Sequence, residues 1–311
     1  MKKSYVLDTN ACRNIVYGCS CRAMYEHKVH GVISFPVITA IELLRHLKFD
    51  DPAYSNCEKA LCLLVDKTMG ISGIDVVIPD MFTLLKNYFS VSGRNDELSL
   101  SIIGISDKIA KGDLIEDQSM IISNIIKYND GIIGEMINNM QYYLDSLSRK
   151  EDTPWNYIIQ NSELRKNYVK NLNSGRFHEY IAMALVRSVI PESELEKRMN
   201  DEIFKKFQLD FSATIDFFVQ KILRLLVSST AAVDKLSSKE RDRTSKRPKW
   251  NSFYDMQLIA GVEYYNCEGS EVKALFVTDE RDIMKSFKNV GKGELVMKLE
   301  DYIGESAFEK K

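Results

Sequence analysis

Apolar positions are spaced differently at the two ends of the chain and in its middle. Near the start, short apolar runs at residues 5–7, 32–35 and 74–78 alternate with stretches of helical spacing at 11–17, 39–48 and 60–69. This alternation predicts strand–helix–strand units whose strands form a parallel sheet. The first run is apolar throughout and has no internal Gly or Pro, so we expect it to be a buried central strand.

The middle of the chain has a different pattern. Apolar residues recur every three to four positions at 121–144, 179–190, 192–207 and 211–227, and Pro191 separates the second stretch from the third. This spacing predicts a block of helices between about residues 83 and 246. Strand-like runs return only at 274–277 and 294–297, after a helical stretch at 254–265.

The expected fold is therefore α/β, with a central parallel sheet interrupted by a large all-helical insertion. Residues 1–82 and 247–311 would form the two halves of one domain, and residues 83–246 would be the insertion. Because insertion points usually lie at the surface, this arrangement does not disturb a common core.

Composition narrows the class of protein. Of 311 residues, 45% are hydrophobic and 28% charged, and no apolar run approaches the roughly 20 residues of a membrane span. The first residues do not resemble a signal peptide, so we expect a cytoplasmic protein with no membrane partner.

The net charge is −2, so nucleic-acid binding would need a local basic patch. The six cysteines have no paired spacing that indicates a zinc or redox site.

Four acidic residues share one position relative to the predicted elements. Each follows a strand directly or lies in the first turn of a helix after one, and they are Asp8, Glu42, Asp255 and Asp282. Since the carboxyl ends of parallel strands meet at one edge of a sheet, we expect these side chains to converge. Converging carboxylates repel one another, and Mg²⁺ or Mn²⁺ would relieve that repulsion. Asp8 also has the position of a helix N-cap, and this second interpretation stays open.

The motifs around these acids resemble the PIN domain, a family of metal-dependent nucleases that includes bacterial toxin ribonucleases and eukaryotic RNA-processing nucleases. The motifs are V-L-D-T-N at 6–10, T-A-I-E-L at 39–43, an Asp at 255 near the start of a helix, and V-T-D-E-R-D-I at 277–283. Together they cover about residues 1–82 and 251–311. The long helical insertion is not part of the family's common pattern.

The resemblance implies a three-layer fold and a function, hydrolysis of phosphodiester bonds with one or two bound ions. It assigns metal-coordinating and catalytic roles to Asp8, Glu42, Asp255 and Asp282, and supporting roles to Asn10, Thr278 and Asp279. The last motif contains three acids, and we favour Asp282 over Asp279 and Glu280 because the family's matching acid precedes a large apolar residue, here Ile283. RNA as the substrate, rather than DNA, rests on the resemblance alone.

The most basic run of the chain spans residues 239–250 and ends just before Asp255. Its cations could hold phosphates that the carboxylates repel, and the candidates are Arg241, Arg243, Lys246, Arg247 and Lys249. A solvated linker is the alternative interpretation of this run. His46, four residues after Glu42, could be a further metal ligand, although a solvated helix face explains it as well.

Two other functions are open. A phosphatase with an aspartyl nucleophile would also begin with an Asp after the first strand, but it normally has a second acid two residues on, where this chain has Asn10. A catalytically inactive scaffold that binds nucleic acid or protein is the second alternative. The helical block could also bind a protein partner or join two copies of the chain.

Overall fold

The computed structural model describes most of the chain outside part of its middle segment. The described residues are 2–20, 24, 28–29, 31–47, 51–69, 77–91, 97–112, 118–134, 161, 163, 166–167, 175–223, 251–268 and 270–308. Within these ranges no helix combines the length and the apolar character needed to cross a membrane.

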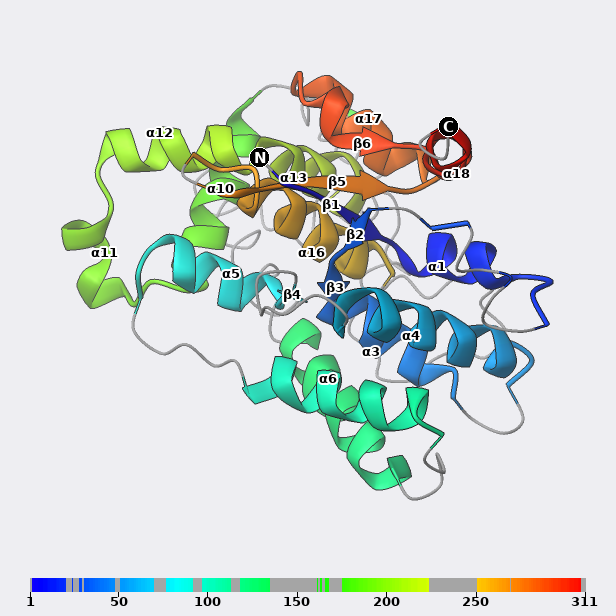
Figure 1. The fold of residues 1–311 in the computed structure, drawn as a ribbon. Coiled ribbons are helices and arrows are strands. Elements are labelled where there is room, and N and C mark those ends of the chain that lie inside the picture. The colour runs from blue at the N-terminus through cyan, green and yellow to red at the C-terminus, as the bar shows by residue number, and fades with distance from the viewer. Residues whose placement is uncertain are drawn as a thin grey trace.

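The main sheet has four parallel strands in the order β2 (Val32–Ile33), β1 (Lys2–Leu7), β5 (Val272–Val277) and β6 (Val296–Met297). Strands β1 and β5 pair along their whole length, from Lys2 opposite Val272 to Leu7 opposite Val277. The N-terminal strand therefore lies beside a strand from the end of the chain (Figure 1). The prediction of an α/β fold with a parallel sheet is confirmed.

The second apolar run forms two strands rather than one. Strand β3 (Phe35–Pro36) leaves the main sheet and pairs with β4 (Val77–Ile78) in a separate parallel sheet. The change of sheet takes place at Ser34, whose N–H donates to Tyr5 O at 2.9 Å and whose hydroxyl lies 2.5 Å from that of Ser4. These bonds satisfy the backbone where the strand bends away, so one continuous strand over 32–35 was a wrong prediction.

The helices of the N-terminal part are α1 (Thr9–Val16), α3 (Val37–Arg45), α4 (Tyr54–Met69) and α5 (Met81–Tyr88). Helix α3 begins at Val37, two residues before the predicted helical stretch at 39–48. The Thr39 hydroxyl donates to Leu7 O at 3.1 Å, at the end of β1. Glu42 therefore lies in the middle of α3, not in its first turn.

The middle segment forms helices only, over the residues that the structure describes. They are α6 (Glu97–Ala110), a helix at 118–134, α10 (Arg176–Arg187), α11 (Glu192–Arg198), α12 (Asp201–Asp210), α13 (Ser212–Phe217) and the π-helix η2 (Phe218–Leu223). The single helix expected over 192–207 is divided, because the Asn200 side chain accepts from Ile203 N at 2.8 Å and caps α12.

The middle segment packs directly on the elements from both ends of the chain. Helix α6 packs on α3 and α4, and α13 packs on α16 (Asn251–Tyr264) and α17 (Arg281–Asn289). Glu263 of α16 is fully buried and accepts hydrogen bonds from the backbone N–H of Ala213 and Thr214, at 2.9 and 2.8 Å, and from Lys292. A buried, fully bonded carboxylate thus joins α13 to the C-terminal part.

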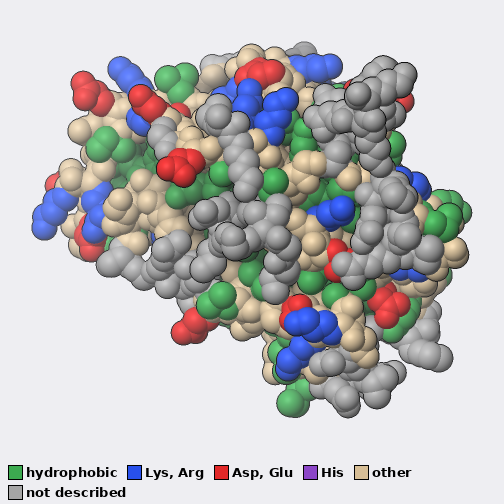
Figure 2. Space-filling model, viewed as in Figure 1, with side chains coloured by type: hydrophobic (Ala, Val, Ile, Leu, Met, Phe, Trp, Pro, Cys, Tyr) green, Lys and Arg blue, Asp and Glu red, His purple; other side chains and the backbone are tan. Residues whose placement is uncertain are grey.

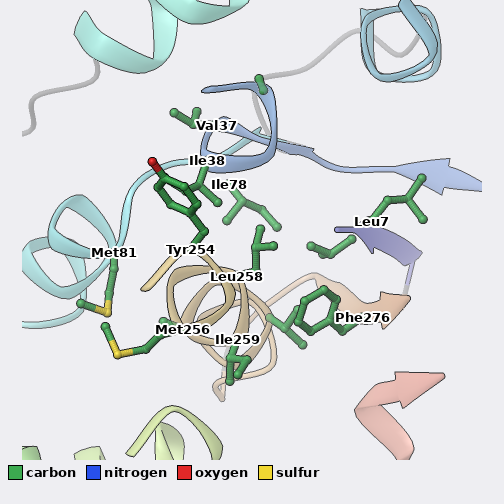
Figure 3. Packing of buried hydrophobic residues seen from close by; sticks show 14 of the residues in the cluster. Leu7, Val37, Ile38, Ile78, Met81, Tyr254, Met256, Leu258, Ile259 and Phe276 are labelled. Carbon is green, nitrogen blue, oxygen red and sulfur yellow. The ribbon is translucent and has the colours of Figure 1, made fainter. Parts of the chain in front are cut away.

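Helix α16 lies at the centre of the packing. Figure 3 shows its Leu258 and Ile259 beside the strands that carry Leu7 and Phe276, and its Tyr254 near Ile38 and Ile78. The chain closes with the 3₁₀ turn η3 (Gly293–Leu295), β6 and α18 (Leu299–Phe308), and α17 lies on the side of the sheet away from α16 in Figure 1. On the face drawn in Figure 2, described acidic and basic side chains are interspersed, in keeping with the near-neutral composition.

Candidate active site

Asp8 lies where the central strand β1 ends, and it is only 4% exposed. One carboxylate oxygen, Oδ1, accepts from Ala11 N at 2.6 Å and caps α1. The other oxygen, Oδ2, is buried and has no hydrogen-bond partner among the described residues. Asp8 is therefore an N-cap that keeps one oxygen available, so the two interpretations of this residue are compatible.

Burial raises the pKa of Asp8 from 3.8 to about 6. The nearby Thr278 hydroxyl and the hydrogen bond from Ala11 act in the opposite direction, and the charges of Glu42 and Glu280 add to the increase. Burying Asp8 thus costs solvation free energy, and the polar groups around it offset only part of that cost.

Glu42 projects from the middle of α3 towards the first turn of α1. The Thr9 hydroxyl donates a hydrogen bond to Glu42 Oε2. Burial raises the pKa of Glu42, while the hydrogen bond from Thr9 and the nearby side chains of His46, Arg45 and Arg13 lower it. The tertiary structure therefore surrounds this carboxylate with cations on its α1 and α3 side.

Asp255 is the fifth residue of α16, because that helix begins three residues earlier than the sequence suggests. Burial holds its pKa well above the usual range, and the charges of Glu42, Asp8 and Glu280 raise it further. Lys221 acts in the opposite direction. Asp255 thus interacts electrostatically with three other acids that come from distant parts of the sequence.

The structure distinguishes the three acids of the last motif. Glu280 lies at the N-cap position of α17, is partly buried, and acts electrostatically on both Asp8 and Asp255. Asp282 is in the first turn of α17 with half of its side chain exposed, and it forms an ion pair with Lys221. The exposed Asp279 accepts from Leu299 N at 3.2 Å, at the start of α18.

Glu280 is therefore the acid of this motif that the structure brings to Asp8, whereas the sequence favours Asp282. One signal in the sequence could have identified Glu280, namely the position at which α17 begins. Glu280 is the N-cap of that helix and therefore lies closer along the chain to the end of β5 than Asp282 in its first turn. We call Asp8, Glu42, Asp255 and Glu280 the acidic site.

The supporting residues differ in their placement. Thr278 is fully buried, and its hydroxyl accepts from Glu280 N at 3.0 Å. Asn10 is exposed on α1. His46 is held by Asp51, at 2.8 Å from Nδ1 to Oδ2. The basic candidates of the 239–250 run lie outside the described residues, namely Arg241, Arg243, Lys246, Arg247 and Lys249.

The donors of the acidic site fit a hard divalent cation by their chemistry. They are carboxylate oxygens, one of which, Asp8 Oδ2, is buried with no hydrogen bond from the part of the chain that the structure describes, and oxygen ligands are those that Mg²⁺ and Mn²⁺ prefer. As the side chains are placed, no three His, Cys, Asp or Glu residues of the described ranges are grouped closely enough to hold an ion. A bound ion would therefore require the carboxylates to move closer together.

Comparisons with protein families, with curated proteins and with solved structures find no match for this chain.

Proposed function

We propose that this chain is a metal-dependent nuclease that hydrolyses phosphodiester bonds, with RNA rather than DNA as its substrate. On this proposal, the four-stranded sheet and its flanking helices form a PIN-like three-layer domain, and the helical middle segment is an insertion in it. The ordered motifs and the placement of Asp8, Glu42 and Asp255 support it.

The observation that carries the proposal is the uncompensated carboxylate at the end of β1. Asp8 is buried, its Oδ2 has no hydrogen-bond partner among the described residues, and the charges of Glu42 and Glu280 raise the pKa of both Asp8 and Asp255. Such a group destabilises the folded protein unless a cation binds it. Perturbed carboxylates of this kind are typical of functional sites rather than of structural cores.

The chain's own residues would bind and orient the substrate and the ion. Asp8 is held by the first turn of α1, and Glu42 is held by Thr9. Thr278 positions the backbone of Glu280 through the bond to its N–H. A Mg²⁺ or Mn²⁺ ion held by these carboxylates would supply Lewis acidity at the scissile phosphate.

The proposal is tested by metal binding and by cleavage, measured separately. Mn²⁺ or Mg²⁺ is titrated while thermal unfolding is followed, and labelled single-stranded RNA, structured RNA and DNA are incubated with Mn²⁺ or with EDTA. The variant is Asp8→Asn, which can still cap α1. The control is Asp107→Asn, because Asp107 lies on α6 and pairs with Lys111.

We expect Mn²⁺ to raise the melting temperature of the wild type and of Asp107→Asn, but not that of Asp8→Asn. RNA should be cleaved in Mn²⁺ and not in EDTA, and Asp8→Asn should lose the cleavage. A wild type that neither gains stability from either ion nor cleaves RNA would contradict the proposal and favour the inactive scaffold.

A further inference from the structure

A lysine from the middle segment lies beside the acidic site. Lys221 belongs to the π-helix η2, which follows α13 directly and packs against α16, the helix that carries Asp255. π-Helical turns are rare and occur frequently at functional sites. The position of Lys221 is therefore set by an unusual backbone segment next to the acids.

Two interactions locate the Lys221 ammonium. Its Nζ forms an ion pair with Asp282 in the first turn of α17, and its charge lowers the pKa of Asp255. The side chains of Lys221 and Asp282 are 37% and 50% exposed, so solvent and ligands can reach the pair. The ammonium is thus both accessible and close to Asp255, a partly buried carboxylate of the site.

We propose that Lys221 binds a backbone phosphate of single-stranded nucleic acid at this site and exchanges its ion pair with Asp282 for the phosphate oxygens. The inference deepens the proposed nuclease function by naming a substrate-binding residue. It assigns to the middle segment a direct part in the site.

Electrostatics favour this role. A phosphodiester that approaches four carboxylates is repelled, and a lysine at the rim offsets that repulsion where the backbone must pass. Lysine is a common phosphate-binding residue, because its ammonium offers three donors on a flexible stem. An ion pair this exposed contributes little to stability, so exchanging its acid for a phosphate costs little.

Binding is measured in EDTA, which prevents metal-dependent cleavage. The probe is a fluorescein-labelled single-stranded RNA, followed by anisotropy at several salt concentrations. The variants are Lys221→Met, Lys221→Arg and Asp282→Asn. The matched control is Lys206→Met, because Lys206 is also a half-exposed lysine paired with an acid, Asp210, but lies on α12 at the far side of the molecule from α1 (Figure 1).

We expect Lys221→Met to bind the RNA roughly three- to tenfold more weakly. The slope of log affinity against log salt should fall by about 0.7, the value for one contact to a single-stranded phosphate. Lys221→Arg should retain the affinity, Lys206→Met should equal the wild type, and Asp282→Asn should bind at least as tightly because it frees the lysine.

Three results would overturn the inference: a wild type that binds no RNA, a Lys221→Met variant with unchanged affinity and salt slope, or equal weakening by Lys221→Met and Asp282→Asn. The last result indicates that the ion pair has a structural role only. Thermal melting of each variant checks that it is folded. If the wild type cleaves RNA in the presence of metal but Lys221→Met binds RNA as tightly as the wild type, this inference alone is refuted. If Lys221→Met binds RNA more weakly but the wild type does not cleave it, only the nuclease function is refuted.

Discussion

The hydroxyl of Thr9 donates a hydrogen bond to the carboxylate of Glu42, and this bond joins the first turn of α1 to the middle of α3. The two residues are 33 positions apart, and Thr9 directly follows Asp8. The bond lowers the pKa of Glu42 against the larger effect of burial. It therefore favours the ionised form of a second carboxylate of the acidic site and holds that carboxylate in place.

Replacing Thr9 by Val removes this donor with little change in volume. The pKa of Glu42 should rise further, so protons should compete better with a metal ion. We expect Thr9→Val to weaken Mn²⁺ binding roughly tenfold at pH 6 and less at pH 8, because fewer protons compete for the carboxylate at the higher pH. Melting temperature as a function of Mn²⁺ concentration measures the effect. Thr9→Ser keeps the hydroxyl and should behave as the wild type, and an equal loss at both pH values would contradict this explanation.

The pKa of Asp8 makes the stability of the metal-free protein depend on pH. Because the folded state holds the proton up to about pH 6 and the unfolded state only up to 3.8, the folded state binds more protons between these values. The free energy of unfolding should therefore fall as the pH rises through this window, by about 3 kcal/mol from this group. Glu42 and Asp255 act in the same direction, since their pKa values are also raised.

Asp8→Asn isolates this contribution, because it removes the charge and keeps the cap. In EDTA at pH 7, we expect the variant to be more stable than the wild type by up to about 3 kcal/mol, and the difference to disappear near pH 4. Urea unfolding at pH 4, 5.5 and 7 measures it. Asp8→Ala should be about 1 kcal/mol less stable than Asp8→Asn because the cap is lost. A wild type more stable than Asp8→Asn at pH 7 without metal would refute the raised pKa.

Arg45 connects α3 to two other helices behind Glu42. Its guanidinium forms an ion pair with Asp130 in the helix at 118–134 and lies 5.7 Å from the centroid of the Tyr254 ring in α16. Only 7% of the Arg45 side chain is exposed. Arg45→Met should lower the free energy of unfolding by about 2–4 kcal/mol, because it leaves Asp130 without this partner and removes the contact with the ring.

Chemical denaturation measures this loss. Arg45→Lys is the informative control, because it keeps the charge and loses the planar, two-point contact, so we expect it to recover only part of the stability. Full recovery with Lys would show that charge alone matters at this position.

Gly261 allows α16 to approach β4 closely. A Cβ at this position would overlap Ile78 Cγ2, whereas one at Gly104 of α6 would meet no other atom within 4 Å. Gly261→Ala should therefore destabilise the protein by about 1–3 kcal/mol, and Gly104→Ala should stabilise it by up to about 1 kcal/mol. Urea unfolding of both variants gives the comparison. Adding Ile78→Ala to Gly261→Ala should cost less than the sum of the two single changes, and strict additivity would exclude the overlap as the cause.

Several features of this protein follow from short stretches of sequence. The apolar run at residues 5–7 indicated the central strand, and Asp8 before an apolar-periodic stretch indicated the cap of α1. The helical spacing of the middle segment was also visible, as was the separation at Pro191, which precedes α11. These features are local, because periodicity and capping depend on residues within one or two turns of each other.

Other features depend on which segments meet in space. Ser34 divides one apolar run between two sheets because its bonds to Tyr5 and Ser4 come from another strand. Glu280 acts electrostatically on Asp8, because the residue at which α17 begins decides which acid of the motif lies at its N-cap. Lys221 reaches Asp282 across 61 residues of sequence.

The sequence by itself thus determined the alternation of strands and helices near the start of the chain, the helices of the middle segment, and the acid that follows the central strand. The tertiary structure alone decided which acids lie together, how far burial raises their pKa, and which cation accompanies them. The physical reason is that desolvation and charge interactions depend on distances between segments, which periodicity along the chain does not contain.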